Sequence, residues 1–96
     1  MLERIKLALR ISHNLLDNEI LQNIAVARAE MVRSGVSEQK SQDDNDPLIC
    51  NAIKIYCLYA MASDEKMSDG YWKSWCYQLE NLRKSTGYCA ESEENV

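Results

Sequence analysis

The chain has 96 residues, of which 46% are hydrophobic and 27% charged, and its net charge is −4. This length suits one small domain, and the composition is typical of a globular chain and argues against a disordered one. Gly (3) and Pro (1) are scarce, which favours helices over a turn-rich β-fold. The segment 1–10 is charged and amphipathic, so we expect no secretory signal peptide in it.

The acidic residues are concentrated in two segments. Segment 36–46 has four acidic residues against Lys40, and segment 88–96 has three with no basic residue. The rest of the chain is slightly basic but lacks the stripe of Lys and Arg that binds phosphate backbones. Specific binding to nucleic acid therefore loses support.

Two helices are expected before residue 36. The first, 2–10, has apolar residues at helical spacing, and it is too short to be stable without docking on another helix. The second is predicted to run from Asn14, as its N-cap, to Ser34, with Gly35 ending it. Its apolar stripe comprises Leu16, Ile20, Ile24, Ala27 and Met31, widened by Leu21 and Ala25.

Segment 36–46, VSEQKSQDDND, has a single apolar residue, Val36, and is predicted to be a mobile polar loop. Loops of this length are uncommon in compact domains, and they are often functional or ordered by a partner.

The third helix has a well-marked start in DPLICNAIKIYCLYAMA (46–62), because Asp46 can cap it and Pro47 suits its first position. After this start only Asn51 and Lys54 are clearly polar. The apolar run 48–62 has 15 residues and is interrupted by Lys54, whereas a membrane span needs roughly 20. We therefore expect protein to cover this helix, which would be the centre of the fold.

The fourth helix is predicted to begin near Ser68 and to end before Gly87. Ion pairs are expected between Asp69 and Lys73 and between Glu80 and Lys84. Its apolar stripe is predicted to be Tyr71, Trp72, Trp75, Cys76, Leu79 and Leu82. These helices form a single domain over residues 1–88, followed by a flexible acidic tail, 89–96.

The cysteines and the histidine give little indication of chemistry. Cys50 and Cys57 would lie roughly 10 Å apart on one helix, beyond the reach of a disulfide. With one histidine and no C-x-x-C pair, no metal site is expected, and Cys50, Cys57 and Cys76 are predicted to be buried thiols in a reducing cytoplasm. His13 lies near Asp17 without a nucleophile, so we expect a surface or capping role, and neither an enzyme nor a cofactor.

The available helices are expected to cover only part of the third helix. The apolar surface left over predicts an interface for self-association. The candidate interface residues are Ile55, Tyr56, Leu58, Tyr59, Trp72 and Trp75.

The order of several short motifs resembles a known family. Leu9-Arg10-Ile11 precedes a turn, Asp17-Asn18-Glu19-Ile20 opens a helix, and Ser34-Gly35-Val36 closes it. After the polar loop, DPLICNAIKIYC supplies an Asp-Pro-Leu-Ile start and an Ala-Ile-x-x-Tyr core, and YQLENLRKSTGY (77–88) supplies a closing helix. Over roughly residues 2–88, this series resembles the small head–tail connector proteins of tailed bacteriophages.

The resemblance implies an all-α structural adaptor with no enzymatic activity. Such proteins form a ring, generally of twelve copies, below the portal vertex, where the ring extends the DNA channel and joins the capsid to the neck or tail. The expected partners are further copies, the portal protein and the next neck protein, in the virion, and DNA passes without sequence-specific binding. Candidate partner-contact residues lie in the loop and the tail, at Glu38, Lys40, Asp43, Asp44, Tyr88 and Glu91.

The alternative is a small helical dimeric regulator that binds DNA or a partner protein. This alternative predicts a basic recognition helix, for which the basic clusters are Arg4-Lys6-Arg10 and Arg83-Lys84.

Overall fold

A computed structural model describes residues 1–90 of the chain. The helices in this range are α1 (Leu2–Leu9), α2 (Asp17–Ser34), α3 (Glu38–Ser41), α4 (Pro47–Ala60) and α5 (Glu65–Lys84). The β-type pairing within residues 1–90 consists of an isolated antiparallel bridge between Val36 and Cys89. The expected all-α fold is therefore confirmed.

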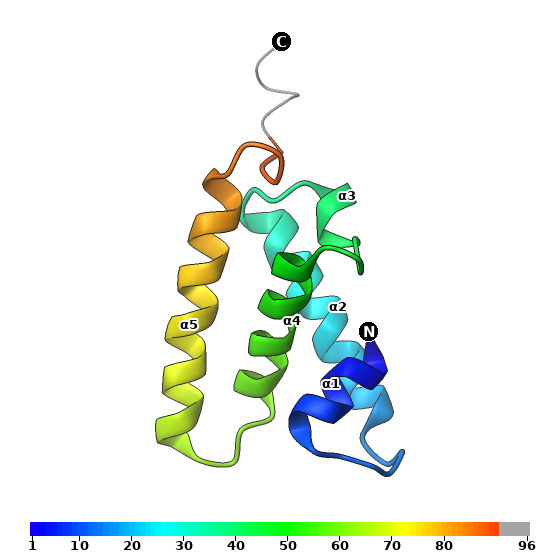
Figure 1. Cartoon of the computed structure of the whole chain (residues 1–96). Coiled ribbons are helices and arrows are strands. Elements are labelled where there is room, and N and C mark those ends of the chain that lie inside the picture. The colour runs from blue at the N-terminus through cyan, green and yellow to red at the C-terminus, as the bar shows by residue number, and fades with distance from the viewer. Residues whose placement is uncertain (91–96) are drawn as a thin grey trace.

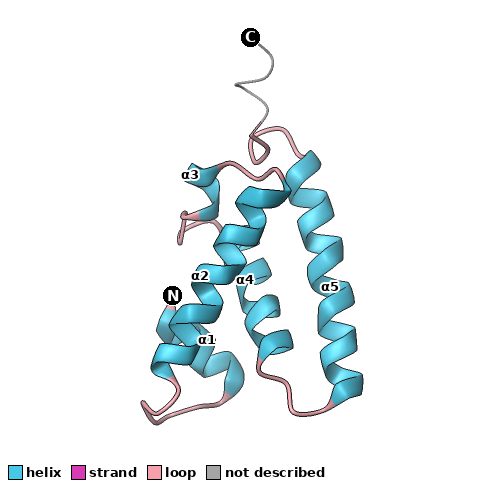
Figure 2. Ribbon diagram, turned by 180° about the vertical axis from the view of Figure 1, so that it is seen from behind, coloured by secondary structure: helices cyan, strands magenta, loops and turns pink. Residues whose placement is uncertain are grey.

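Helix α4 lies between α5 on one side and α2 on the other, with α1 and α3 near opposite ends of α2 (Figure 1; Figure 2). It contacts α1, α2 and α5, so the prediction of a central third helix is correct. The core that these helices enclose consists of Ile5, Ile20, Ile24, Ala27, Met31, Val36, Ile49, Ala52, Ile53, Cys57, Trp75 and Leu82.

The start of α4 follows directly from its first residues. The carboxylate of Asp46 accepts hydrogen bonds from the backbone N–H groups of Leu48 (2.9 Å) and Ile49 (3.3 Å), and Pro47 occupies the first turn. These bonds satisfy N–H groups that have no partner inside the helix.

Helix α2 begins three residues after the predicted N-cap. Asn14 does not cap it; its side-chain oxygen instead accepts a hydrogen bond from the buried Lys6 ammonium at 2.8 Å. The same ammonium forms a 2.9 Å ion pair with Asp17. The end of α2 is as predicted, because Gly35 adopts a left-handed φ of 118° and the N–H of Val36 donates to the carbonyl of Met31.

Helix α5 begins earlier than Ser68 because Asp64 caps it through the N–H of Lys66, at 2.8 Å. Trp75 and Leu82, two turns apart, are buried, whereas the prediction of a buried Cys76 is wrong. Cys76 follows Trp75 by one residue, a rotation of about 100°, and therefore points away from the core. The ion pairs expected within this helix are present: Asp69–Lys73 at 3.5 Å and Glu80–Lys84 at 2.7 Å.

The prediction of an unstructured loop over 36–46 is wrong. Val36 is fully buried, and Ser37 caps α3 by accepting from the N–H of Lys40. After α5 the chain turns back across this segment: Ser37 N–H donates to the Tyr88 carbonyl (2.7 Å) and Ala90 N–H donates to the Gly35 carbonyl (2.8 Å). The domain boundary expected after residue 88 therefore falls inside the segment 88–90 that pairs with residues 35–37. The remainder of the expected tail, 91–96, lies outside the described residues.

No helix within residues 1–90 combines the length and the apolar character that a membrane crossing would need.

Replacing Ile53 by Ala tests the central position of α4. Ile53 is fully buried, so its truncation should lower the free energy of unfolding by about 2–4 kcal/mol in chemical denaturation. Leu15→Ala is the matched control, because Leu15 is 86% exposed and should change stability by about 0.5 kcal/mol or less. Equal effects of the two substitutions would contradict this packing.

Candidate functional site

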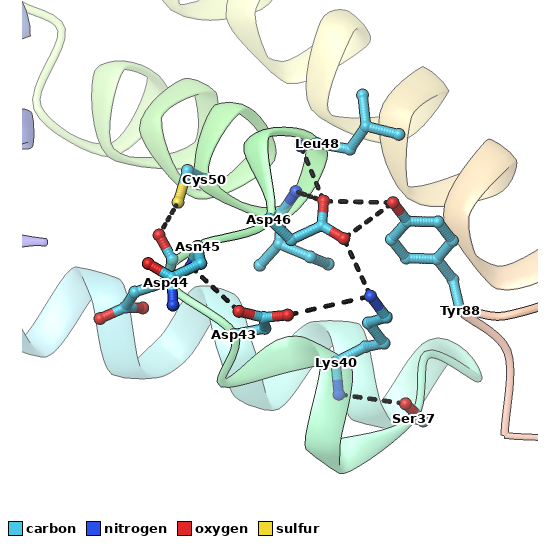
Figure 3. Close-up of polar contacts among 10 residues, drawn as sticks. Ser37, Lys40, Asp43, Asp44, Asn45, Asp46, Leu48, Cys50 and Tyr88 are labelled. Atoms are coloured by element: carbon cyan, nitrogen blue, oxygen red, sulfur yellow. Dashed lines mark hydrogen bonds and ion pairs between the residues drawn. The ribbon is translucent and has the colours of Figure 1, made fainter.

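The carboxylate of Asp46 joins three segments of the chain (Figure 3). Besides capping α4, it accepts a hydrogen bond from the Tyr88 hydroxyl at 2.8 Å and from the Lys40 ammonium at 3.0 Å. The Lys40 ammonium also lies 5.0 Å from the centre of the Tyr88 ring, within range of a cation–π contact. Asp46 thereby holds α3 and the C-terminal segment onto the start of α4.

These contacts shift the protonation equilibria of all three groups. Burial alone would raise the pKa of Asp46, but hydrogen bonds from Tyr88, Lys40 and the helix backbone outweigh burial and hold this pKa below its ordinary 3.8. The hydrogen bond to Asp46 raises the pKa of Tyr88 and that of Lys40. The ionised carboxylate and the protonated ammonium are thus the forms that the fold favours.

A second set of contacts fixes the chain just before Asp46. Arg28 of α2 donates to the Ser41 carbonyl (2.9 Å) and forms a 2.8 Å ion pair with Asp44. The Asp44 carbonyl accepts from Arg4 of α1 (2.9 Å) and from the Cys50 thiol (3.0 Å). Segment 41–46 is therefore bonded to three helices and is part of the folded body.

The structure changes the interpretation of the predicted partner-contact residues. Lys40, Asp43 and Tyr88 cluster around Asp46, with Asp43 3.8 Å from the Lys40 ammonium. Lys40 and Tyr88 are engaged within the chain and remain partly exposed, so their contact with a partner stays a prediction. Glu38 is exposed on α3, and Glu91 lies outside the described residues.

The predicted interface residues form an aromatic ladder between α4 and α5, but they are not equally accessible. Tyr56 contacts Trp75 edge-on (ring centroids 5.0 Å apart), and Tyr59 contacts Trp72 (4.9 Å). Trp75 is 2% exposed, so the prediction that it can meet a neighbour is wrong: it fills the groove between the two helices. Trp72 is 41% exposed, and the remaining members are half-buried: Ile55, Tyr56, Leu58 and Tyr59.

The outer face of α2 is a second apolar surface, which the sequence interpretation missed. Leu21 (48% exposed) and Val32 (42%) flank Ala25 and Ala29 along a shallow groove of about 600 Å³, bordered by α3. Leu21 and Ala25 had been expected to widen the buried stripe. The i, i+4, i+8 spacing of Leu21, Ala25 and Ala29 indicates a second stripe of its own.

A third surface, also missed, is a groove of about 610 Å³ between α1 and α4. Its rim carries Arg4, Asn51 and Lys54, and its apolar lining includes Leu7, which is 79% exposed. The two polar residues that interrupt the apolar run of α4 therefore face this groove. The i, i+3 spacing of Asn51 and Lys54, which places them on one side of the helix, was the sequence signal for this groove.

The thiols and the histidine do not assemble into a reactive site in the described part of the chain. Burial raises the pKa of the Cys57 thiol to about 11, which suppresses the reactive thiolate. Cys50 is half-buried, and Cys76 is exposed. His13 is exposed, and its Nδ1 accepts from the N–H of Leu15, as expected of a local cap. Residues 1–90 contain no cluster of His, Cys, Asp and Glu that could hold a metal ion.

No protein-family model, curated protein or solved structure matches the chain. The surfaces of the molecule and the order of its motifs therefore carry the functional conclusion.

Replacing Asp46 by Asn tests the Asp46 cluster. Asn can still cap α4, but it loses the charge that binds Lys40 and Tyr88, so stability at pH 7 should fall by about 1–3 kcal/mol. Because the folded pKa of Asp46 lies below 3.8, this stabilisation is complete above about pH 5 and is lost as the pH falls through the folded pKa. Denaturation of both proteins between pH 2 and 7 measures the difference.

Asp43→Asn is the matched control, because it removes the same charge from a more exposed carboxylate 3.8 Å from Lys40. It should change stability by about 0.5 kcal/mol or less. A stability difference between the original protein and Asp46→Asn that stays constant down to pH 2 would contradict the role given to the carboxylate.

Proposed function

We propose that the chain is a structural head–tail connector of a tailed phage or prophage. In this function, copies of the chain form a ring below the portal, extend the DNA channel and join the capsid to the neck or tail. The function is mechanical and needs neither a catalytic residue nor a cofactor.

The observation that carries this proposal is the presence of two different exposed apolar surfaces on different helices. One is the outer face of α2 around Leu21 and Val32, and the other is the exposed side of Trp72, at the junction of α4 and α5. Helix α4 contacts both α2 and α5, and these two helices also contact each other (Figure 1; Figure 2). A ring requires that one face of each copy meets a different face of the next, as two unlike faces allow.

The positions of the resemblance motifs give further support. Asp17-Asn18-Glu19-Ile20 opens α2, Ser34-Gly35-Val36 closes it, and Asp46 and Pro47 start α4. Each motif thus lies where its residues determine a helix boundary. A fold shared with the connector family would place the motifs at these helix boundaries.

The charge distribution favours the connector over a DNA-binding regulator. Lys6 is buried and paired with Asp17, which divides the basic cluster of α1. Arg83 and Lys84 both pair with Glu80, at 2.9 and 2.7 Å. The α5 cluster is thus paired, and the α1 cluster is reduced to Arg4 and Arg10, too few cations for a stripe that follows a phosphate backbone, whereas a channel wall must let DNA slide.

Assembly can be tested by native mass spectrometry and light scattering at increasing concentration, with and without the cognate portal. We expect a ring-sized oligomer, and Val32→Asp should lower the assembled fraction at least tenfold because it places a charge on the α2 face. Leu15→Asp, at an exposed site outside both faces, is the matched control and should assemble normally.

A chain that stays monomeric even with the portal would overturn the proposal. Sequence-specific retardation of DNA in a gel-shift assay at physiological salt would instead support the regulator.

A further inference from the structure

The groove between α1 and α4 combines cations with an apolar floor and contains no acidic side chain. The residues that line it are Met1, Arg4, Ile5, Leu7, Ala8, Pro47, Cys50, Asn51 and Lys54. Arg4 and Lys54 are the charged members, and they come from different helices. This composition suits an acidic ligand that also buries some apolar surface.

The two cations of the groove have no carboxylate partner within residues 1–90. Arg4 donates to the Asp44 carbonyl and to the Cys50 sulfur (3.0 Å), but within residues 1–90 no carboxylate pairs with it. Lys54 has no ion pair in that range, and the Asn51 amide has no hydrogen-bond partner there. A half-buried amide beside two uncompensated cations is well suited to an extended acidic peptide, whose backbone the amide can bind.

Residues 91–96 of the chain, ESEENV, have the matching chemistry. They contain Glu91, Glu93 and Glu94 and no basic residue. In an extended peptide, Glu91 and Glu93 would lie about 6.8 Å apart. Cys50, which Arg4 contacts, and Lys54 are four residues apart on α4, or about 6 Å. The backbone spacing of the two glutamates is thus similar to that of Cys50 and Lys54.

The reach of the segment limits what the same copy can supply to its own groove. The near end of the groove is at Pro47, next to Asp46, which binds Tyr88 of the same copy. Lys54 lies seven residues further along α4, or about 10 Å beyond that end. Ala90 is held at Gly35, and Glu94, the last acid, lies four residues after Ala90, a reach of about 14 Å. A second copy can supply the segment without this limit.

We propose that the α1–α4 groove binds residues 91–96 of a second copy, with Arg4 and Lys54 pairing with its glutamates. Each copy then contributes a tail to one neighbour and a groove to another, a head-to-tail contact of the kind that builds a ring when the rotation between copies closes. The inference rests on the self-association in the proposed function and identifies a contact that links neighbours.

A peptide titration tests the groove directly. A fluorescein-labelled peptide with the sequence of residues 90–96 is titrated, by anisotropy in 50 mM salt, with the full chain carrying E91Q, E93Q and E94Q. We expect saturable binding that weakens at least tenfold in 500 mM salt. Lys54→Glu should weaken it at least tenfold and Lys54→Gln about threefold, whereas Lys66→Glu, the matched charge reversal on α5, should not. Equal binding by the Lys54 and Lys66 variants, or no saturable binding, would overturn the inference.

A charge swap in the full chain tests the contact between copies. Lys54→Glu alone should reduce the oligomeric fraction at least fivefold, and combining it with E91K and E93K should restore most of the loss. Circular dichroism melting of Lys54→Gln serves as the control for folding of the groove variants. Failure of the swap to restore assembly would overturn the inference, as would a peptide contact that forms within one copy at any concentration. A ring that still assembles in either case would leave the proposed connector function standing.

Discussion

A carboxylate taken out of water must find donors, and for Asp46 these donors come from three separate parts of the chain. Asp46 is 9% exposed, and its oxygens accept from the first turn of α4, from Lys40 on α3 and from Tyr88 beyond α5. Any arrangement that loses one of these segments leaves a buried charge incompletely satisfied, which is costly. The burial of Val36 and the pairing of residues 35–37 with 88–90 follow from the same closure. The Asp46 side chain therefore connects α3 and the C-terminal segment to α4, and the contacts of Arg28 and the backbone bonds of residues 35–37 add to it.

The second constraint is the apolar surface of α4. Its buried stripe, Ile49, Ala52, Ile53 and Cys57, is covered by α1, α2 and α5, and the aromatic ladder of Tyr56 and Tyr59 is partly covered by α5. Because α2 and α5 each bury one stripe against this centre, apolar surface remains exposed on the outer side of α2, at Val32, and at the edge of the aromatic ladder, at Trp72. Surface of this kind in a small chain is typical of association. The requirement to cover α4 thus determines both the core and the apolar surface that remains exposed.

Features that depend on a few adjacent residues were predictable from the sequence. The Asp46-Pro47 start of α4 and the Gly35 end of α2 depend on capping and on backbone dihedral angles, which are local. Features that depend on distant partners were not: Asn14 binds Lys6 in place of capping α2, and the polar segment 36–46 is ordered by contacts with α1, α2 and Tyr88. The sequence placed Trp75 correctly in the apolar stripe of α5. The pattern of a stripe does not show, however, which of its side chains a neighbouring helix buries. For the same reason the exposed apolar face of α2 was not predicted.

The two polar side chains of α4 connect these points to assembly. On a helix covered all round, Asn51 and Lys54 would each need a partner from a neighbouring element, as Asp46 has from Lys40 and Tyr88. No such partner is provided within residues 1–90, and α1 leaves a groove above them. Helix α4 is therefore covered by apolar contacts on most of its surface and is polar where it faces the groove. A charged ligand in the groove can bind the Asn51 amide and the Lys54 ammonium. The acidic residues that follow Ala90 have the opposite charge, so under the proposed contact the segment that pairs with Lys54 in one copy would also join that copy to the next.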